Sequence, residues 1–319
     1  MRALFSVAVV ALGVGGLCSA QTYPSKPIRF VAAFPAGGPS DIVARAFGKR
    51  MADVMGQPVV IDNRAGAGGN IGAENVAKSP PDGHSVLLGG SYLTIAPSLY
   101  LKLPFDPEKD FAPVALLVSN QYVLVTHPSV PVSSVRDLIK LAKARPGRLN
   151  YGSAGIGSPP HLSGELFKTM AGLEINHIPY KGATPALVDL IGGHIDVYFG
   201  GISGTLPHIK SRKVRALAVT SERRSSQLPE VSTIAEAALP GYDIATWFGL
   251  LAPAGTPKEI VGKLSTVMLG IANEPETRAY LIGQGVEPSP AGPEQFAAYI
   301  RAEIPKFAKI VKAAGIRPE

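Results

Sequence analysis

The stretch Phe34-Pro35-Ala36-Gly37-Gly38-Pro39-Ser40-Asp41 decides the fold of this chain. An apolar run precedes it at residues 28–33, and an amphipathic run follows it at residues 42–55. This order predicts a strand, a glycine-rich turn and the start of a helix, which Ser40 and Asp41 could cap. Unpaired N–H groups and the positive end of the helix dipole then meet at one point, which suits a carboxylate or a phosphate. A plain βα turn without a ligand is the alternative interpretation.

A second stretch of this kind lies in the middle of the chain, Tyr151-Gly152-Ser153-Ala154-Gly155-Ile156-Gly157-Ser158-Pro159-Pro160-His161-Leu162. It also joins a strand to a helix, and Ser158-Pro159 is typical of a helix start. Two such turns predict an acid held from two sides. Gly89-Gly90-Ser91-Tyr92 follows a short strand and offers a further wall with hydroxyl groups, although an ordinary loop explains it equally well.

Apolar runs of strand length alternate with helical patterns along the whole chain, which predicts an α/β fold. Several runs are apolar throughout, as in parallel sheets covered on both faces. We expect a kink or break at Pro305 in the last helix, and a capping box from Thr256 to Glu259. The predicted strands are residues 28–33, 59–62, 85–88, 114–118, 122–126, 149–153, 177–180, 195–199, 214–220 and 248–252.

The predicted strands at 114–118 and 122–126 lie almost end to end, separated by three residues. This arrangement favours a chain that leaves one lobe there, enters a second lobe and returns near Trp247. We therefore expect lobe 1 to contain residues 21–121 and 246–319, and lobe 2 to contain residues 122–245. Two strands would form the hinge, and the cleft between the lobes would be the ligand site.

The first twenty residues are typical of a signal peptide, with Arg2, an apolar run at 3–17 and the small residues Ser19 and Ala20 at its end. We expect cleavage after Ala20 and a periplasmic protein; a lipoprotein reading of Cys18 is the weaker alternative. Cys18 is the only cysteine, so the mature chain would have no disulfide. The net charge of +7 is spread along the chain, which argues against nucleic-acid binding.

The chain lacks the patterns of the common catalytic sites. It has no Gly-x-Ser-x-Gly elbow, no dinucleotide fingerprint and no phosphate loop. The glycine-rich segment 66–70 has the wrong spacing for a phosphate cradle and is expected to start a helix. The six histidines show no metal-ligand spacing, and no carboxylate pair suggests acid–base catalysis. We therefore expect no enzyme activity, no metal and no cofactor.

Many short motifs, in order and with matching spacing, resemble the exported solute-binding receptors of the tripartite tricarboxylate transporter family, the Bug receptors. Besides the two turns they include Tyr23-Pro24-x-x-Pro27, Asn63-Arg64-x-Gly66-Ala67-Gly68-Gly69, Pro81-Asp82-Gly83, Tyr180-Lys181-Gly182, Gly192-Gly193-x-Ile195-Asp196, Leu206-Pro207-x-Ile209 and Ala252-Pro253-Ala254-Gly255-Thr256-Pro257. The resemblance implies a two-lobed type II periplasmic binding-protein fold, each lobe a mostly parallel sheet flanked by helices.

The resemblance also implies a receptor that captures a small organic carboxylate for a membrane permease. By position, the ligand-binding residues would be Phe34, Gly37, Gly38, Ser40, Asp41, Ser91, Tyr92, Ser153, Ala154, Gly155, Gly157, Ser158, His161, Gly200 and Gly201. Asp41 is expected to hold its turn rather than to touch a carboxylate.

Gly200 and Gly201 stand where relatives often carry an acidic residue, which favours a plain organic or aromatic acid over an amino acid. We expect a monomer. An exported α/β enzyme acting on an acid, and a receptor that presents its ligand to a membrane sensor, are the alternatives.

Overall fold

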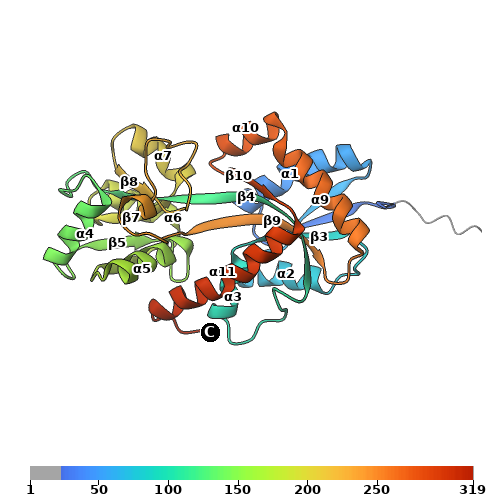
Figure 1. Cartoon of the computed structure of the whole chain (residues 1–319), viewed down its shortest axis with the longest axis horizontal. Helices are drawn as coiled ribbons and strands as arrows, with labels where there is room; N and C mark the ends of the chain where they lie inside the picture. The colour runs from blue at the N-terminus through green and yellow to red at the C-terminus, as the bar shows by residue number, and fades with distance from the viewer. Residues whose placement is uncertain (1–22, 319) are drawn as a thin grey trace, which may run out of the picture.

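The computed structural model describes residues 23–318. The predicted signal peptide, Cys18 and the cleavage after Ala20 lie outside the described residues. Two lobes lie side by side, and two long strands, β4 (Phe111–Thr126) and β9 (Ala245–Pro253), run between them (Figure 1). The α/β fold class predicted from the alternation of strands and helices is confirmed.

Lobe 1 is built around the strand order β2-β1-β3-β9-β4, with β10 paired to β4. β1 is parallel to β2 and β3, whereas β9 is antiparallel to β3 and β4. The strands are β1 (Ile28–Ala32), β2 (Val59–Asn63), β3 (Ser85–Gly90) and β10 (Glu287–Ala291). The helices are α1 (Pro39–Met55), η1 (Ala67–Gly69), α2 (Asn70–Ala77), α3 (Tyr92–Leu99), α9 (Lys258–Asn273), α10 (Pro275–Gly283) and α11 (Pro293–Ala313).

Lobe 2 continues the sheet from β4 through β7, β5 and β6, and β8 also pairs with β4. β5 is parallel to β6 and β7, whereas β7 and β8 are antiparallel to β4. The strands are β5 (Asn150–Ser153), β6 (Asn176–Pro179), β7 (Val197–Gly201) and β8 (Arg215–Val219). The helices are α4 (Val135–Ala144), α5 (Pro159–Ala171), α6 (Ala183–Ile191), α7 (Ile202–Lys210) and α8 (Ile234–Ala237).

Two details of the predicted sheets are corrected. The segments 114–118 and 122–126 form one unbroken strand, β4, because residues 119–121 pair with β9 and leave no turn. Each lobe holds a mixed sheet rather than a mostly parallel one, since β4 is antiparallel to each of its partners in both lobes. The partner of β4 changes between Gln121, opposite Ala245 in β9, and Tyr122, opposite Gly201 in β7.

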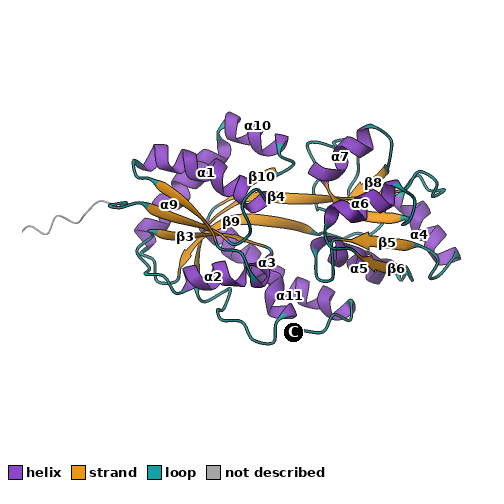
Figure 2. Cartoon of the chain, turned by 180° about the vertical axis from the view of Figure 1, so that it is seen from behind, coloured by secondary structure: helices purple, strands orange, loops and turns teal. Residues whose placement is uncertain are grey.

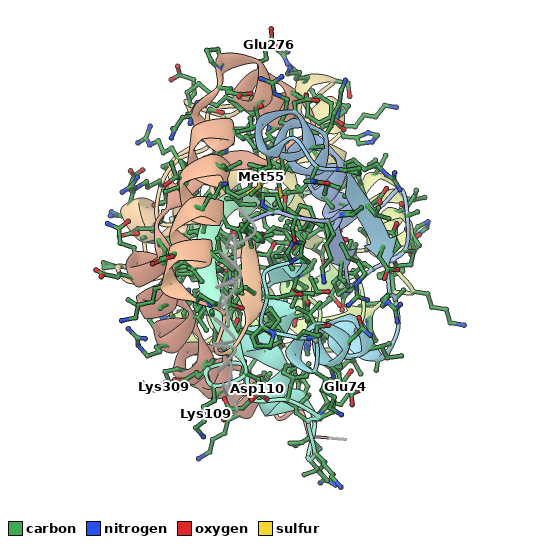
Figure 3. All side chains as sticks on the ribbon, turned by 90° about the vertical axis from the view of Figure 1, so that its right-hand side faces the viewer. Met55, Glu74, Lys109, Asp110, Glu276 and Lys309 are labelled. Carbon is green, nitrogen blue, oxygen red and sulfur yellow. The ribbon has the colours of Figure 1, made fainter. Side chains whose placement is uncertain are left out.

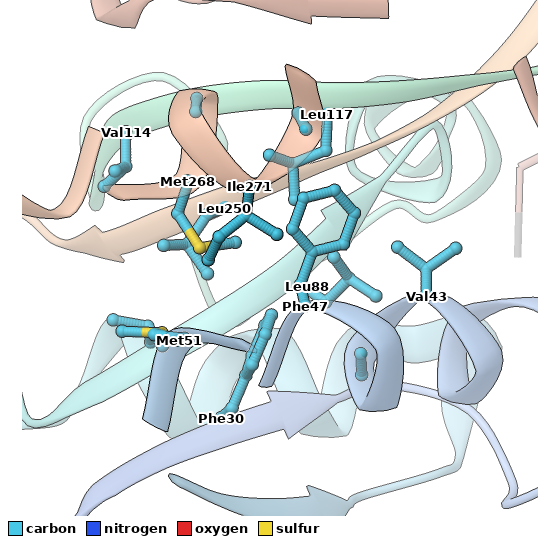
Figure 4. Close-up of a cluster of buried hydrophobic side chains, with 14 of the residues drawn as sticks. Phe30, Val43, Phe47, Met51, Leu88, Val114, Leu117, Leu250, Met268 and Ile271 are labelled. Carbon is cyan, nitrogen blue, oxygen red and sulfur yellow. The ribbon is translucent and has the colours of Figure 1, made fainter. Parts of the chain in front are cut away.

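The sheet of lobe 1 is covered by helices on both faces. Phe30 points to the face covered by α1 and α9, and Val31 points to the face covered by α2, α3 and α11. On the first face, Phe47 and Met51 of α1 and Met268 of α9 belong to one apolar cluster (Figure 4). A helix with apolar residues three and four positions apart buries one stripe in this way, and that burial positions the start of α1 at the end of β1.

Lobe 2 repeats this layering with its own cores. One core gathers α4, α5 and α8 around Phe167 and Phe199, and the other gathers α6 and α7 around Tyr198. Figure 2 shows α5 and α6 beside the strands of this lobe. α11 is continuous through Pro305, so of the kink or break that this proline predicts, the break does not occur. The helix buries Phe296 and Ile300 before the proline and Phe307 after it, and this burial offsets the one backbone hydrogen bond that the proline removes.

Among the described Asp, Glu, Lys and Arg residues, all but Asp41, Glu165 and Glu303 are at least partly exposed. Figure 3 shows Glu74, Lys109 and Glu276 pointing outward around the rim of lobe 1. Within residues 23–318, no helix has both the length and the apolar character needed to span a membrane.

Candidate functional site

A cavity of about 870 Å³ lies where the two lobes meet. The first turn closes it from lobe 1, the second turn closes it from lobe 2, and α3 and the crossing strands β4 and β9 form its other walls. Its lining consists of Phe34, Pro35, Ala36, Gly37, Gly38, Pro39, Ser40, Gly68, Ser91, Tyr92, Ile95, Ala96, Leu99, Tyr100, Asn120, Tyr122, Ile156, Gly157, Ser158, Pro159, Thr246, Trp247 and Phe248.

Asp41 holds the first turn from behind. Gly37 has a φ of +82°, and its N–H donates to Asp41 Oδ2 at 2.9 Å. Asn63 Nδ2 donates to Asp41 Oδ1 at 3.0 Å and to the carbonyl of Phe34 at 3.2 Å, while Arg45 Nε donates to Oδ2 at 2.8 Å. Gly38, rather than Ser40 or Asp41, occupies the position that caps the helix.

The Asp41 side chain is 5% exposed. Its hydrogen bond from Arg45 outweighs the opposing effect of burial, and its bonds from Gly37 and Asn63 add to that, so the pKa of the carboxyl is lowered. Asp41 is therefore ionised at neutral pH, with its charge paired on the side away from the cavity lining.

His161 holds the second turn in the same manner. Gly157 has a φ of +75°, and its N–H donates to His161 Nδ1 at 3.0 Å. At the other end of the turn, the N–H of Gly155 donates to Ser153 Oγ at 3.1 Å, and Ser153 Oγ lies 2.6 Å from His177 Nε2. The Ser158 hydroxyl donates to the carbonyl of Gly155 at 2.6 Å, which closes the turn.

Behind this turn the rings of His161 and His177 stack, with centroids 4.0 Å apart and 17° between the planes. Burial lowers the pKa of His161. Burial, followed by the proximity of His161, lowers the pKa of His177 to about 4, so both rings are neutral at pH 7. Glu165 accepts hydrogen bonds from Tyr151 and from Lys168 beside the pair.

Because of these hydrogen bonds, only some backbone amides of the two turns are free to bind a ligand. The amides of Gly37 and Gly157 are used inside their own turns. Pro39, Pro159 and Pro160 have no N–H, and Leu162 already donates to the carbonyl of Ser158. The helix starts therefore keep their favourable dipoles but offer few free donors, namely Ser40 and Asp41 in α1 and His161 in α5.

Residues that carry hydroxyl groups also line the cavity. Tyr92 lies edge-on to Phe34, with ring centroids 5.3 Å apart. Within residues 23–318, the buried oxygens Tyr92 OH and Ser40 Oγ find no hydrogen-bond partner. Ser91 is already engaged, since its hydroxyl accepts the N–H of Trp247 at 2.9 Å.

The predicted site residues divide into two groups. Eight of the fifteen line the cavity: Phe34, Gly37, Gly38, Ser40, Ser91, Tyr92, Gly157 and Ser158. Asp41, Ser153, Ala154, Gly155 and His161 belong to the two turns but lie outside the lining, and Gly200 and Gly201 end β7 beside α7. His161 instead lines a second cavity of about 530 Å³, together with His177 and residues 314–317 of the C-terminal segment.

The sequence did not predict the cavity-lining residues that come from other segments. Asn120, Tyr122 and Trp247 come from the two crossing strands. Their place at the predicted hinge could have identified them, because a cleft between two lobes is bounded by the segments that join them. Ile95, Leu99 and Tyr100 come from α3 and the residue after it, and no pattern in the sequence marks them as facing a cavity.

The cavity is neutral and largely apolar. Among the described residues that line it, none is Lys, Arg, His, Asp or Glu. Across residues 23–318, no group of three or more acidic, histidine or cysteine side chains is arranged to hold a metal ion. The arrangement can therefore hold an anion through dipoles and hydroxyl groups around an apolar body, without an opposing charge.

Comparison with known proteins gives a consistent result. The model of the family described as "Tripartite tricarboxylate transporter family receptor" matches residues 43–316. Protein BugT of Bordetella pertussis is 37% identical over 319 residues, covering 99% of this chain and 98% of that protein. The structure of R. palustris Rpa4515 with adipate has a TM-score of 0.77 and 39% identity, covering 93% of this chain and all of that one. MatC from Rhodopseudomonas palustris with bound malate has a TM-score of 0.71 and 32% identity, covering 91% and 100%.

Proposed function

This chain belongs to the tripartite tricarboxylate transporter receptor family, and we propose from that premise that it clasps a small organic carboxylate between its two lobes. As a member of a receptor family it is a binding protein and not an enzyme. The observation that carries the proposal is that the turns before α1 and α5, one from each lobe, line the same cavity.

Two helix starts and a set of hydroxyl groups hold the carboxylate. The positive ends of α1 and α5 favour a negative charge in the cavity, by typically 0.3–1 kcal/mol each at an exposed site and more when water is excluded. The free amide of Ser40 and the hydroxyl groups of Ser40 and Tyr92 are the donors on the lobe 1 side. Gly157 and Ser158 form the wall on the lobe 2 side, and Phe34 packs against the body of the ligand.

The preferred ligand is an organic or aromatic acid without an amino group. An ammonium group would be desolvated in this cavity without a carboxylate to pair with it, because the lining residues carry no charge. Phe34, Leu99 and Phe248 give the ligand body an apolar surface. Gly200 and Gly201 do not line the cavity, so the absence of an acidic residue there has no bearing on the ligand class.

The two lobes move toward each other when the acid binds. We propose that residues 21–121 with 246–319 form one rigid unit and residues 122–245 the other, supported by the change of partner of β4 between Gln121 and Tyr122. The protein acts as a periplasmic monomer after cleavage following Ala20. Its partner is the permease of a tripartite tricarboxylate transporter, which reads the closed form.

A calorimetric titration of the mature protein at pH 7.5 tests the ligand class. Adipate, malate, benzoate and aspartate are compared, after a thermal-shift screen of other carboxylic acids. We expect at least one acid without an amine to bind and aspartate to bind more weakly than malate, its nearest match in size. Preference for aspartate would overturn the ligand class, and a lack of binding by every acid screened would overturn the function.

A further inference from the structure

Both turns use the same local device. In each, a glycine with positive φ donates its N–H to the side chain four residues later, at the third position of the helix. Gly37 donates to Asp41 at 2.9 Å and Gly157 donates to His161 at 3.0 Å. The side chain at the third helical position thus fixes the shape of the turn before the helix. A capping box makes a similar bond, but its donor is the N–H of the next residue, the helix cap.

The two acceptors differ in charge, and their surroundings explain the difference. Asp41 has Arg45 four residues on, at 2.8 Å, so its negative charge is paired. His161 has Glu165 four residues on, with Nε2 and Oε1 4.0 Å apart. A carboxylate at position 161 would face a second carboxylate, whereas a neutral imidazole accepts the Gly157 amide without adding negative charge near a bound acid.

The imidazole is itself held in place. His161 is 4% exposed and stacks on His177, which lies 2.6 Å from the Ser153 hydroxyl at the other end of the turn. Ser153 accepts the amide of Gly155 at 3.1 Å. The stacked side chains of His161 and His177 therefore connect the Gly157 amide to the Ser153 hydroxyl.

Building on the proposed carboxylate function, we propose that His161 is a positioning residue whose neutral ring holds the Gly157 amide and thereby keeps the second turn in its ligand-binding shape. It acts through the turn, because it does not line the main cavity. Since Nδ1 accepts, the proton of the neutral ring sits on Nε2, on the side of Glu165.

Protonation of His161 removes the acceptor and releases the turn. The titratable groups near the ring are Glu165 and Lys168 on α5 and His177 on β6, and Tyr151 on β5 donates to Glu165 and stacks on His177. Arg317 lines the cavity that the ring also lines. Burial disfavours the charged ring and, together with Lys168, outweighs Glu165, which favours it; the pKa of His161 is therefore lowered and the ring is neutral at pH 7.

Three substitutions of His161 test separately the hydrogen-bond acceptor, the shape and the charge of this side chain. His161→Asn retains an acceptor near the place of Nδ1, His161→Phe retains only the stacking surface, and His161→Asp adds a negative charge. For adipate and benzoate at pH 7.5, we expect His161→Phe to bind about tenfold more weakly, because a turn that has lost this hydrogen bond must be ordered when the acid binds. His161→Asn should recover most of that loss, and His161→Asp should not. His194→Phe, at an exposed histidine of lobe 2, is the matched control and should bind as the parent does.

A measurement without ligand decides the proposal even if the variants fold poorly or neither acid binds. In ¹⁵N-labelled parent protein we expect the tautomer with the proton on Nε2 of His161, and a Gly157 amide resonance that shifts with the midpoint of the His161 titration. The positioning role would be overturned if the Gly157 amide resonance did not shift with the His161 titration. It would also be overturned if His161→Asn and His161→Phe bound the acids with equal affinity. Failure of all acids to bind with the amide coupling intact would instead count against the carboxylate function alone.

Discussion

Tyr92 lines the cavity, and its buried hydroxyl has no hydrogen-bond partner within residues 23–318. Burial raises the pKa of this phenol above its usual range, so it remains protonated and can donate. An unpaired buried polar group costs roughly 1–3 kcal/mol of stability. A binding protein can tolerate this loss of stability if its ligand supplies the missing acceptor. The unpaired hydroxyl of the ligand-free protein is then explained by its function.

Tyr92→Phe should therefore move stability and binding in opposite directions. We expect unchanged or higher thermal stability without ligand, because the unpaired hydroxyl is gone, and about tenfold weaker carboxylate binding. Thermal unfolding and calorimetry measure the two effects. Tyr280→Phe, at a half-exposed tyrosine on α10, is the control and should change neither. Unaltered affinity in Tyr92→Phe would remove this hydroxyl from the ligand contacts.

The histidine pair makes stability depend on pH. The pKa of His177 is lowered to about 4 by burial and by His161, while an unfolded histidine titrates near 6.5. Between these two values the unfolded chain binds more protons than the folded one. Stability should therefore fall as the pH drops from about 6.5 to about 4 and level off below.

Thermal unfolding of the parent and of His177→Phe across this range checks the sign. The variant keeps a stacking surface without the titrating group, so its melting temperature should decline less steeply. A parallel decline in both proteins would show that other groups cause the acid sensitivity. His194→Phe, which removes an exposed histidine, should follow the parent.

At the scale of elements, local signals located most strands and helices because the pattern of buried residues repeats with the period of each element. The misses came from contacts across the chain. Thr256 does not form a capping box, since its hydroxyl donates to the carbonyl of Pro253 at 2.7 Å and the helix begins at Lys258. β10 carries two prolines and was not predicted, and it exists as an edge partner of β4.

Close packing of α11 on the sheet gives a test at this scale. A Cβ added to Gly249 in β9 would lie 2.4 Å from Phe296 Cζ and 2.8 Å from the carbonyl oxygen of Ala115. Gly249→Ala should therefore destabilise the protein by roughly 1–3 kcal/mol in denaturant unfolding. Gly262→Ala is the matched control, because its Cβ meets nothing within 4 Å and it lies exposed in α9. It should stabilise by about 0.5–1 kcal/mol. Equal effects would contradict the packing described here.

For the whole molecule, the two lobes touch in places other than the crossing strands. Ile95 of α3, Leu162 of α5 and Phe307 of α11 share one apolar cluster, so the last helix packs against both lobes. The Ser226 hydroxyl donates to Glu287 at 2.9 Å, and Lys306 donates to Asp243 at 2.8 Å. Movement of the lobes must therefore preserve or rearrange these contacts, which limits the directions in which the cleft can close.

Closure should be visible in solution. Small-angle scattering of the mature protein with a saturating acid from the screen should give a smaller radius of gyration than the protein alone, because contacts from both turns are complete only when the lobes approach. An acid that does not bind in calorimetry serves as the control and should leave the scattering unchanged. A tightly bound acid without compaction would contradict the clasping mechanism.

The sequence by itself determined the α/β alternation, the two glycine turns and the family. These depend on local order and spacing, which a chain carries before it folds. The tertiary structure decided that β4 is one strand, that α3 and Trp247 wall the cavity, and that no charged side chain lines it among the described residues. It also decided that His161 stands behind its turn, against His177 from a neighbouring strand. Such facts depend on contacts between distant residues, which form only when the sheet brings its strands together.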